Sequence, residues 1–345
     1  MHSPEISVII PAYNEERYLH VMLDCVLRQT MQDYEIIIVN DGSKDSTQSV
    51  IDGYISKHPE RIRCITQENQ GLSASRNNAI EIARGRYIAF LDADDLIDDR
   101  YLSALHAAAE AGQADIVKCS YIDFDDDTGK TLAEIDVTKR TVSFEPGTDY
   151  VFQYCAWAGM YRADFINRYS LRFSVGEQME DSPFSLTAHQ LANRVAAVGL
   201  YLYSHRMHSG SIMANVKGAK KDPKIPYRGF EGAVNNVRRY IDNPIRLDIA
   251  EYCFLRVMSD YATERYKTQS RDVRKKLCAY LMRILNEYFP DAEKNPYLFG
   301  KKAANIGGLP LFEREAVRLF VLSAKTGLLY PFSSATSAVL RLIER

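Results

Sequence analysis

The segment Tyr87-Ile88-Ala89-Phe90-Leu91-Asp92-Ala93-Asp94-Asp95 is a short apolar run that ends in three carboxylates. Such a run predicts a buried strand that delivers its acidic side chains to a loop at the edge of a sheet. Carboxylates this close together repel one another, and a hard cation such as Mn²⁺ or Mg²⁺ relieves that repulsion. The alternative is a solvated acidic turn before a helix, because Asp favours turns and N-caps.

Apolar strands and amphipathic helices alternate along the chain before this segment. The strand and helix patterns follow one another in the order 6–10, 17–30, 34–39, 47–57, 62–66 and 72–83. This order predicts an α/β fold whose mostly parallel sheet is covered by helices on both faces. Ligands of such sheets bind outside the carboxyl ends of the strands, so we expect the residues that follow the strands to meet at one edge.

Polar residues stand at each of these strand ends. They are Tyr13, Asn14, Glu15, Asp41, Asn69, Gln70, Gly71, Asp92, Asp94 and Asp95. Singly, each could be an ordinary cap or turn residue. No G-x-G-x-x-G follows the first strand and no G-x-x-x-x-G-K-[ST] occurs, so the sequence has neither a dinucleotide fingerprint nor a P-loop. We therefore expect a bound diphosphate to be held by a metal ion and by side chains such as Arg76.

The composition is that of an ordinary soluble protein that is long enough for two domains. The chain has 345 residues, of which 46% are apolar and 26% are charged. Its six cysteines lie far apart with no C-x-x-C pair, which predicts neither a zinc site nor a disulfide framework. We find no signal peptide and no apolar run long enough to span a bilayer, so we expect a cytoplasmic location.

Charge divides the chain into two regions. Residues 1–214 hold 19 Lys and Arg against 31 Asp and Glu, a net charge of −12, whereas residues 215–345 hold 24 against 14, a net charge of +10. This shift predicts a catalytic domain over 1–214 and a basic, mainly helical region over 215–345. The helices of the basic region either pack as a core or lie on an anionic membrane surface. Without a zinc-finger or RNA-binding signature, we do not expect a nucleic-acid partner.

Four segments resemble the signature motifs of the family 2 glycosyltransferases. They are Val8-Ile9-Ile10-Pro11-Ala12-Tyr13-Asn14-Glu15-Glu16, Val39-Asn40-Asp41-Gly42-Ser43, Asn69-Gln70-Gly71-Leu72-Ser73-Ala74-Ser75-Arg76-Asn77 and Leu91-Asp92-Ala93-Asp94-Asp95, in this order. The resemblance implies a GT-A fold and metal-dependent, inverting transfer from a nucleotide sugar, usually a UDP-sugar. The acceptor it implies is a glycan or lipid-linked glycan, as in the assembly of bacterial surface polysaccharides at the inner face of the membrane.

The resemblance also implies roles for single residues. Pro11, Tyr13, Glu15 and Asp41 would hold the base and ribose, Asp92 would contact the ribose or the sugar, and Asp94 would ligate Mn²⁺ or Mg²⁺. The remaining members of the expected nucleotide-sugar site are Asn69, Gly71, Arg76, Ala93 and Asp95.

Three later segments resemble the same family more thinly. Trp157 lies in a W-x-x-x-Y-R segment, which implies a place beside the acceptor, although an ordinary core position explains it equally well. Asp181 stands in Glu180-Asp181-Ser182-Pro183-Phe184, similar to an E-D-x-x-F segment in which the Asp is the general base and Glu180 lies near the acceptor. As an alternative or additional role, Asp181 before Ser182-Pro183 could cap a helix. His208 stands in an R-x-H-x-x-S segment that resembles one of the family's motifs. The resemblance implies that His208 is a third metal contact beside the carboxylates.

Two other classes of protein remain open at this point. A nucleotidyltransferase also combines an α/β sheet with paired carboxylates and a metal, but it would normally carry a Gly-rich, Lys-bearing loop where this chain has Pro11-Ala12-Tyr13-Asn14-Glu15. A non-catalytic nucleotide-sugar binding protein would not need both Asp94 and Asp181. The sequence therefore favours a sugar transferase.

Overall fold

The computed structural model describes residues 3–145, 148–176, 180–208, 227–300, 302–303, 306–308 and 310–343. The chain divides into two compact units, one formed by Met1–Thr141 and Asp149–His208 and the other by Val142–Thr148 and Ser209–Arg345. The predicted domain boundary between Ala214 and Asn215 falls within 209–226, outside the described residues. It stays a prediction.

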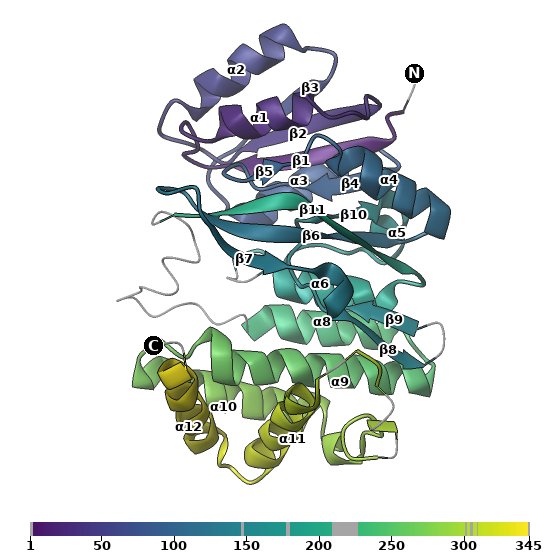
Figure 1. Ribbon diagram of the computed structural model, residues 1–345, viewed down its shortest axis with the longest axis vertical. Coiled ribbons are helices and arrows are strands. Elements are labelled where there is room, and N and C mark those ends of the chain that lie inside the picture. The colour runs from purple at the N-terminus through teal and green to yellow at the C-terminus, as the bar shows by residue number, and fades with distance from the viewer. Residues whose placement is uncertain are drawn as a thin grey trace. The chain divides into compact units, whose positions relative to one another are not determined.

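The first unit is built on a twisted sheet whose first four strands are parallel. They are β1 (Ile6–Ala12), β2 (Tyr34–Asn40), β3 (Ile62–Thr66) and β4 (Tyr87–Phe90). They lie side by side in the order β3-β2-β1-β4 (Figure 1). Every residue of β1, β2 and β4 is buried, which explains their nearly continuous apolar sequences. The four predicted strands are confirmed.

Helices cover both faces of this sheet. The helices that follow the strands are α1 (Leu19–Leu27), α2 (Thr47–Lys57), α3 (Leu72–Ile82) and α4 (Tyr101–Gly112). Val8 and Ile10 share one hydrophobic cluster with residues of α1, α2 and α4. On the other face, Phe90 of β4 contacts Phe173 and the Phe184 ring of α6 (Asp181–Leu191), while α3 packs against β1 and β2. The α/β fold with helices on both faces is confirmed.

The second half of the sheet mixes strand directions. Its strands are β5 (Leu96–Ile97), β6 (Ile116–Asp125), β7 (Thr131–Ile135), β10 (Gly159–Arg162) and β11 (Val195–Met207). β10 lies antiparallel between β4 and β6, and β11 lies parallel to β6 and antiparallel to β5. Asp92-Ala93-Asp94-Asp95 form an acidic loop between β4 and β5. Since β5 directly follows this acidic loop, its pairing with β11 brings the end of β11 to the loop.

Short elements connect these strands. A hairpin turn over 125–130 joins β6 and β7, which pair in antiparallel fashion. The 3₁₀ helix η1 (Val137–Arg140) follows β7, and α5 (Ala163–Arg168) follows β10. β8 (Thr141–Glu145) and β9 (Thr148–Val151) form a separate two-stranded sheet.

The second unit is helical, as predicted. Its elements are α8 (Tyr227–Tyr240), α9 (Pro244–Asp260), the π-helical turn η2 (Tyr261–Arg265), α10 (Arg271–Tyr288), the 3₁₀ helix η3 (Ala292–Lys294), α11 (Leu311–Lys325) and α12 (Leu329–Ile343). α9 begins at Pro244, because Asn243 caps the backbone N–H groups of Ile245 and Arg246 and Pro244 suits the first helical position. Among the described helices, none combines the length and apolar character needed to cross a bilayer.

Candidate active site

The three carboxylates after β4 have different surroundings. Asp95 is 1% exposed, and its two oxygens accept hydrogen bonds from the Tyr203 hydroxyl at 2.5 Å and from the Arg206 backbone N–H at 2.7 Å. Burial, followed by the nearby charge of Asp94, raises the pKa of Asp95 well above its usual value. These bonds fix the loop to the end of β11. In the structure, the Asp95 oxygens bind Tyr203 and Arg206. A contact of Asp95 with the nucleotide sugar stays a prediction.

Asp94 lies beside His208, as the predicted metal site requires. Asp94 Oδ2 is 2.9 Å from His208 Nε2, and the backbone carbonyl of Asp94 accepts a 2.5 Å hydrogen bond from Arg206 Nε. Within the described ranges, no set of three or more His, Cys, Asp or Glu side chains surrounds a common metal position. A carboxylate and an imidazole nonetheless fit a cation such as Mn²⁺ that takes its other ligands from a diphosphate and water.

The loop after β1 lies close to these acids. Burial, followed by the charges of Asp94, Asp92 and Asp45, raises the pKa of Glu15 to about 8. The Glu15 backbone N–H donates to Thr47 Oγ1 at 2.8 Å, which ties this loop to the start of α2. A cation bound next to Asp94 would reverse the local field and favour ionised Glu15.

Two neighbours of Glu15 in the predicted nucleotide site are placed differently from one another. Pro11 is buried in β1, opposite Val39 of β2. Tyr13 is 46% exposed at the end of that strand, as an aromatic side chain that receives a ligand must be. Stacking of this ring on a base stays a prediction.

Asp41 shapes the loop after β3. It is 3% exposed and accepts hydrogen bonds from the backbone N–H groups of Gln70 and Gly71, each at 2.8 Å, and from Gln67 Nε2 at 2.7 Å. Gly42 next to it has a φ of 72°, and a Cβ there would come within 2.8 Å of the Asn69 backbone nitrogen. The loops after β2 and β3 therefore lie together, with Asn69 exposed on them.

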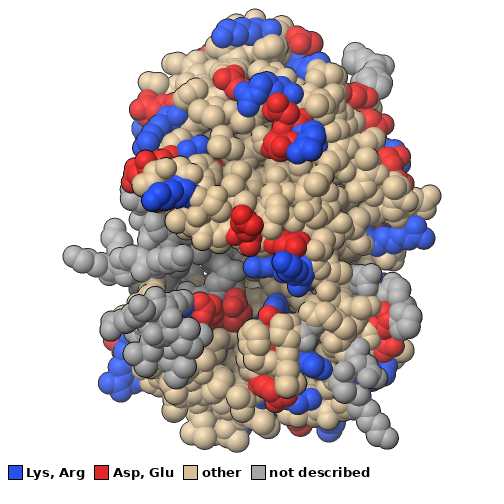
Figure 2. Space-filling model, in the orientation of Figure 1, with Lys and Arg blue, Asp and Glu red and all other residues tan. Residues whose placement is uncertain are grey.

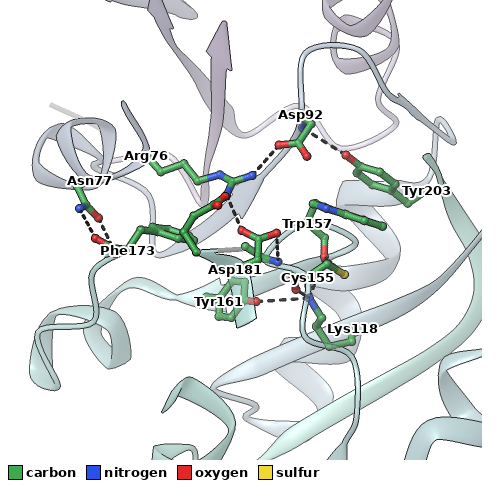
Figure 3. A network of polar contacts seen from close by, with 12 residues as sticks. Arg76, Asn77, Asp92, Lys118, Cys155, Trp157, Tyr161, Phe173, Asp181 and Tyr203 are labelled. Atoms are coloured by element: carbon green, nitrogen blue, oxygen red, sulfur yellow. Dashed lines mark hydrogen bonds and ion pairs between the residues drawn. The ribbon is translucent and has the colours of Figure 1, made fainter. Parts of the chain in front are cut away.

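Arg76 joins the acidic loop to the start of α6. Its side chain is 1% exposed, its Nη2 donates to Asp92 Oδ1 at 2.7 Å, and its Nη1 donates to Asp181 Oδ1 at 2.5 Å and Glu180 Oε1 at 2.9 Å (Figure 3). Burial opposes its charge, but the three carboxylates outweigh this and raise the pKa of Arg76. The expected contact of Arg76 with a diphosphate stays a prediction, since carboxylates occupy both Nη atoms in the structure.

Asp181 and Glu180 share Arg76 but differ in their other contacts. Asp181 is the first residue of α6, and its Oδ2 accepts a 3.1 Å hydrogen bond from the Ala156 backbone N–H. Glu180 occupies the N-cap position without a capping hydrogen bond. The predicted alternative that Asp181 caps this helix is therefore wrong, because its oxygens bind Arg76 and Ala156 instead. Burial, followed by the charge of Asp181, raises the pKa of Glu180 to about 7.

Trp157 is packed between aromatic neighbours. It is 9% exposed, and its ring stacks on Tyr203 at 4.9 Å and on His205 at 4.8 Å. Tyr203 and His205 are two apart on β11 and so point to the same side of the sheet. Burial opposes protonation of His205, but a hydrogen bond to Asp123 and the charge of Asp95 outweigh it and raise the pKa of His205 to about 9. An acceptor contact by Trp157 stays a prediction.

Sequence reasoning missed three residues that hold this site together. Tyr203 and Arg206 bind the acidic loop, and Lys118 binds the segment that carries Ala156 and Trp157. Nothing local marks Tyr203, because its partners lie more than 100 positions away, whereas Arg206 begins the R-x-H-x-x-S segment that contains His208. Lys118 did carry a signal. A lysine inside the apolar run Ile116-Val117-Lys118-Cys119 is unusual for a buried strand.

Known structures share this fold. TarS residues 1–349 of S. aureus, solved in complex with UDP-GlcNAc, match with a TM-score of 0.70 at 17% identity, over 94% of this chain and 92% of that chain. The mannosyltransferase PcManGT of Pyrobaculum calidifontis, in complex with GDP-Man and Mn²⁺, matches with a TM-score of 0.52 at 14% identity, over 96% and 88% of the two chains. The protein thus has the GT-A fold.

The sequence comparisons give the family. Residues 7–167 match the model of glycosyl transferase family 2. EpsH of Bacillus subtilis (strain 168), named as a glycosyltransferase, is 37% identical over 223 residues, which cover 62% of this chain and 64% of that protein. Residues 7–167 therefore form a domain that matches glycosyl transferase family 2. The chain spans just under two thirds of the length of this relative.

The raised pKa of Glu180 predicts a pH-dependent stability. In the folded protein Glu180 keeps its proton up to about pH 7, whereas the unfolded chain loses it near the ordinary value of 4.5. Wild-type stability should therefore fall as pH rises between these values, because the folded state binds more protons there. Glu180→Gln, which resembles the protonated acid, should lack this fall.

We expect the melting temperature of Glu180→Gln relative to wild type to increase from pH 5 to pH 8, measured by scanning calorimetry. Glu81→Gln, at an exposed acid on α3, is the control and should keep a constant difference from wild type. A difference for Glu180→Gln that stays constant or decreases would contradict the assignment.

Proposed function

We propose that this protein transfers a sugar from a nucleotide sugar, most simply a UDP-sugar, to a hydroxyl group of a glycan or lipid-linked glycan. The observation that carries the proposal is the bridge that Arg76 makes between Asp92 and Asp181. It places a carboxylate of the acidic loop and a carboxylate at the start of a helix on the same guanidinium. A transferase needs such a pair, one near the donor and one near the incoming hydroxyl.

The donor site we propose lies at the carboxyl ends of β1, β2, β3 and β4. Tyr13 and Glu15 come from the first loop, Asp41 stabilises the third, and Asp92 follows β4. Bonds between the loops hold them together before any ligand binds, which lowers the entropy lost on binding. TarS and PcManGT were solved with UDP-GlcNAc and GDP-Man respectively, which supports a nucleotide-sugar donor and leaves its base and sugar to experiment.

The proposed metal is Mn²⁺ or Mg²⁺, held by Asp94 and His208. Their oxygen and nitrogen atoms lie 2.9 Å apart, and Arg206 fixes the backbone of Asp94 from behind. When bound, such a cation supplies a Lewis acid that stabilises the negative charge of the departing diphosphate. Arg206, Tyr203 and Asp95 position the loop for it.

Asp181 is the proposed general base. It takes the proton of the acceptor hydroxyl, the acceptor oxygen forms a bond to the anomeric carbon, and the bond from that carbon to the diphosphate breaks with its electron pair on the diphosphate. Attack from the face opposite the leaving group inverts the configuration at the anomeric carbon. Asp181 is 20% exposed at its side chain, against 12% for Glu180, so Asp181 is the more accessible of the two acids.

The contact that we propose with the membrane, and with an acceptor in it, involves the second unit. α11 has an outward apolar face, with Leu311, Phe312, Leu319 and Leu322 between 47% and 72% exposed, and Leu328 follows at 57%. On the face shown in Figure 2, Lys and Arg are interspersed with Asp and Glu and do not gather into one large patch. We propose that this helix and the net charge of +10 over residues 215–345 bring the enzyme to the anionic inner face of the cell membrane, where a lipid-linked acceptor resides.

The metal proposal predicts that a chelator abolishes sugar transfer. Asp94→Ala and His208→Ala should weaken nucleotide binding when Mn²⁺ is present, and binding without Mn²⁺ should not change, because the side chains act through the cation. Titration calorimetry with UDP, with and without Mn²⁺, measures this. Asp127→Ala, at an exposed acid of the hairpin turn, is the control. Equal turnover with and without chelator would remove the metal from the proposal.

The general-base proposal predicts that Asp181→Asn lowers sugar transfer by about 10²- to 10⁴-fold, the usual contribution of a positioned base. Donor affinity should barely change, because Asp181 lies on the acceptor side of Arg76. Steady-state rates with a panel of nucleotide sugars and binding of UDP measure the two effects. Glu180→Gln is the matched variant. If Glu180→Gln loses transfer and Asp181→Asn keeps it, Glu180 is the base, and if both stay active, neither carboxylate is.

The membrane proposal predicts that the full-length protein floats with anionic liposomes at low salt. Added salt should release it, because attraction of about 1 kcal/mol per basic residue near the surface is screened. Phe312→Ser combined with Leu322→Ser should reduce flotation, whereas Leu132→Ser, at a residue 57% exposed on the first unit, should not. Wild-type protein that stays in the soluble fraction at low salt rules out direct binding to lipid.

A further inference from the structure

Lys118 is a charged residue in the core of the first unit. It lies on β6 with 0% exposure, and its Nζ donates to the backbone carbonyls of Cys155 at 2.7 Å and Trp157 at 2.8 Å and to the Tyr161 hydroxyl at 3.4 Å (Figure 3). In the part of the chain that the structure describes, no carboxylate lies within ion-pair distance of Nζ. Burying an ammonium among neutral partners lowers the stability of the folded protein. An apolar residue at this position would therefore stabilise the fold more than Lys118 does.

The two carbonyls that Lys118 binds flank Ala156. The carbonyl of Cys155 and the N–H of Ala156 belong to one planar trans peptide group, in which C=O and N–H point in opposite directions. The oxygen end meets the Lys118 ammonium, and the N–H end donates to Asp181 Oδ2 at 3.1 Å. A single peptide group therefore stands between a buried cation and the proposed general base, with its dipole aligned to both charges.

The sequence after Trp157 makes room for the lysine. Ala158 has a φ of 50°, in the left-handed region that non-glycine residues seldom adopt. At Gly159, a Cβ would lie 2.7 Å from Lys118 Cδ and 2.5 Å from the Val117 carbonyl oxygen. The turn is thus built around the side chain of Lys118, and it places the carbonyl of Trp157 on Nζ.

The ionisable groups around this peptide keep Lys118 charged. Tyr161, Cys155, Cys119 and His189 face Lys118. Burial opposes its charge, but Tyr161 and Cys155 outweigh it and raise the pKa of Lys118. Burial, followed by the charge of Lys118, lowers the pKa of His189 to about 4, so this imidazole is neutral near pH 7.

Asp181 has its own set of ionisable neighbours. Arg76 contacts it directly, and Glu180, Asp92 and Cys155 lie within electrostatic range. The Cys155 thiol stays neutral near pH 7, because burial raises its pKa to about 11. Near that pH, therefore, Asp181 has the Arg76 guanidinium on one oxygen and the peptide N–H oriented by Lys118 on the other.

We propose that Lys118 is a positioning residue for sugar transfer: through the peptide group between Cys155 and Ala156, it orients and polarises the N–H that holds the carboxylate of Asp181. This inference rests on the proposed role of Asp181 as general base. A cation at the carbonyl end makes the N–H a stronger donor, and a hydrogen bond to the charged form of an acid favours that form. Lys118 thereby holds the carboxylate of Asp181 aligned without touching substrate.

Lys118→Met tests the proposal, because methionine retains an unbranched stem and lacks the ammonium. We expect kcat, and the rate constant measured in single-turnover reactions, to fall about 10- to 100-fold, as for other misplaced catalytic groups. The acidic limb of its pH profile should move to higher pH, since Asp181 loses stabilisation of its charged form. The KM for the nucleotide sugar should not change. Tyr161→Phe removes only the longest of the three Lys118 bonds and leaves the ammonium on both carbonyls, so kcat should fall much less than in Lys118→Met.

A folded Lys118→Met enzyme with wild-type kcat and pH profile overturns the proposal, and so does a Tyr161→Phe enzyme that changes as much as Lys118→Met. If Lys118→Met loses transfer without a shift in its pH profile, Lys118 serves packing only and the proposal also fails. Asp181→Asn separates this failure from that of the proposed function. Full activity of Asp181→Asn would remove Asp181 as the base, whereas its inactivity beside a normal Lys118→Met would remove only Lys118.

Should Lys118→Met not fold, the wild-type protein still decides the matter. With alanine labelled by ¹⁵N, the Ala156 amide proton should shift with pH as its carboxylate acceptor titrates. This titration should persist in Glu180→Gln and disappear in Asp181→Asn. An Ala156 amide that does not respond to pH in the wild-type protein, or that responds equally in both variants, shows that the peptide does not hold Asp181 and overturns the proposal.

Discussion

One buried guanidinium holds the candidate active site together. Arg76 is almost inaccessible to solvent and binds Asp92, Glu180 and Asp181, which come from two places about 90 positions apart in the chain. Removing one partner from a buried ion pair typically destabilises a protein by about 3–5 kcal/mol, because the remaining charge stays buried. The acidic loop and the start of α6 are thus bound to the same point, and neither can move without exposing a charge to an apolar core.

Burial, together with an excess of negative charge near Arg76, explains the raised pKa values of the acids in this region. Three carboxylates share one guanidinium, and Asp94 and Asp95 stand close by, so charge neutrality needs either protons or cations. Burial, followed by the charges of neighbouring carboxylates, raises the pKa of Glu180 to about 7 and that of Glu15 to about 8. A divalent cation and the guanidinium would together balance the acids and a bound diphosphate. The same electrostatic imbalance therefore favours the ligands we propose.

The end of β11 provides the second fixed point. Tyr203 and Arg206 bind the backbone and the carboxylate of the acidic loop, His208 reaches Asp94, and Trp157 stacks over Tyr203 and His205. Tyr203, His205, Arg206 and His208 belong to β11 or to the segment after it, so the register of β11 against β5 and β6 decides where these four lie. A shift of that register by one residue would turn each side chain to the other face of the sheet.

Local patterns were enough to predict the α/β fold, because strand and helix periodicities differ and the parallel strands are buried on both faces. The family motifs identified most of the strand-end residues, since Pro11, Asp41, Asp92 and Asp94 sit in short segments whose spacing is read directly along the chain. The helical character of the last third also followed from its periodicity. These features depend on interactions between residues close in sequence.

Only the tertiary structure showed what these residues bind. Arg76 was expected to contact a diphosphate, and the structure shows it buried against three carboxylates. Asp181, expected to be the general base and alternatively a helix cap, binds Arg76 and the Ala156 peptide. Lys118, Tyr203 and Arg206 gained their roles from partners 37 to 112 positions away. Long-range pairing of charges and peptide dipoles depends on strand register and on the meeting of distant loops, and no periodicity within the sequence encodes either.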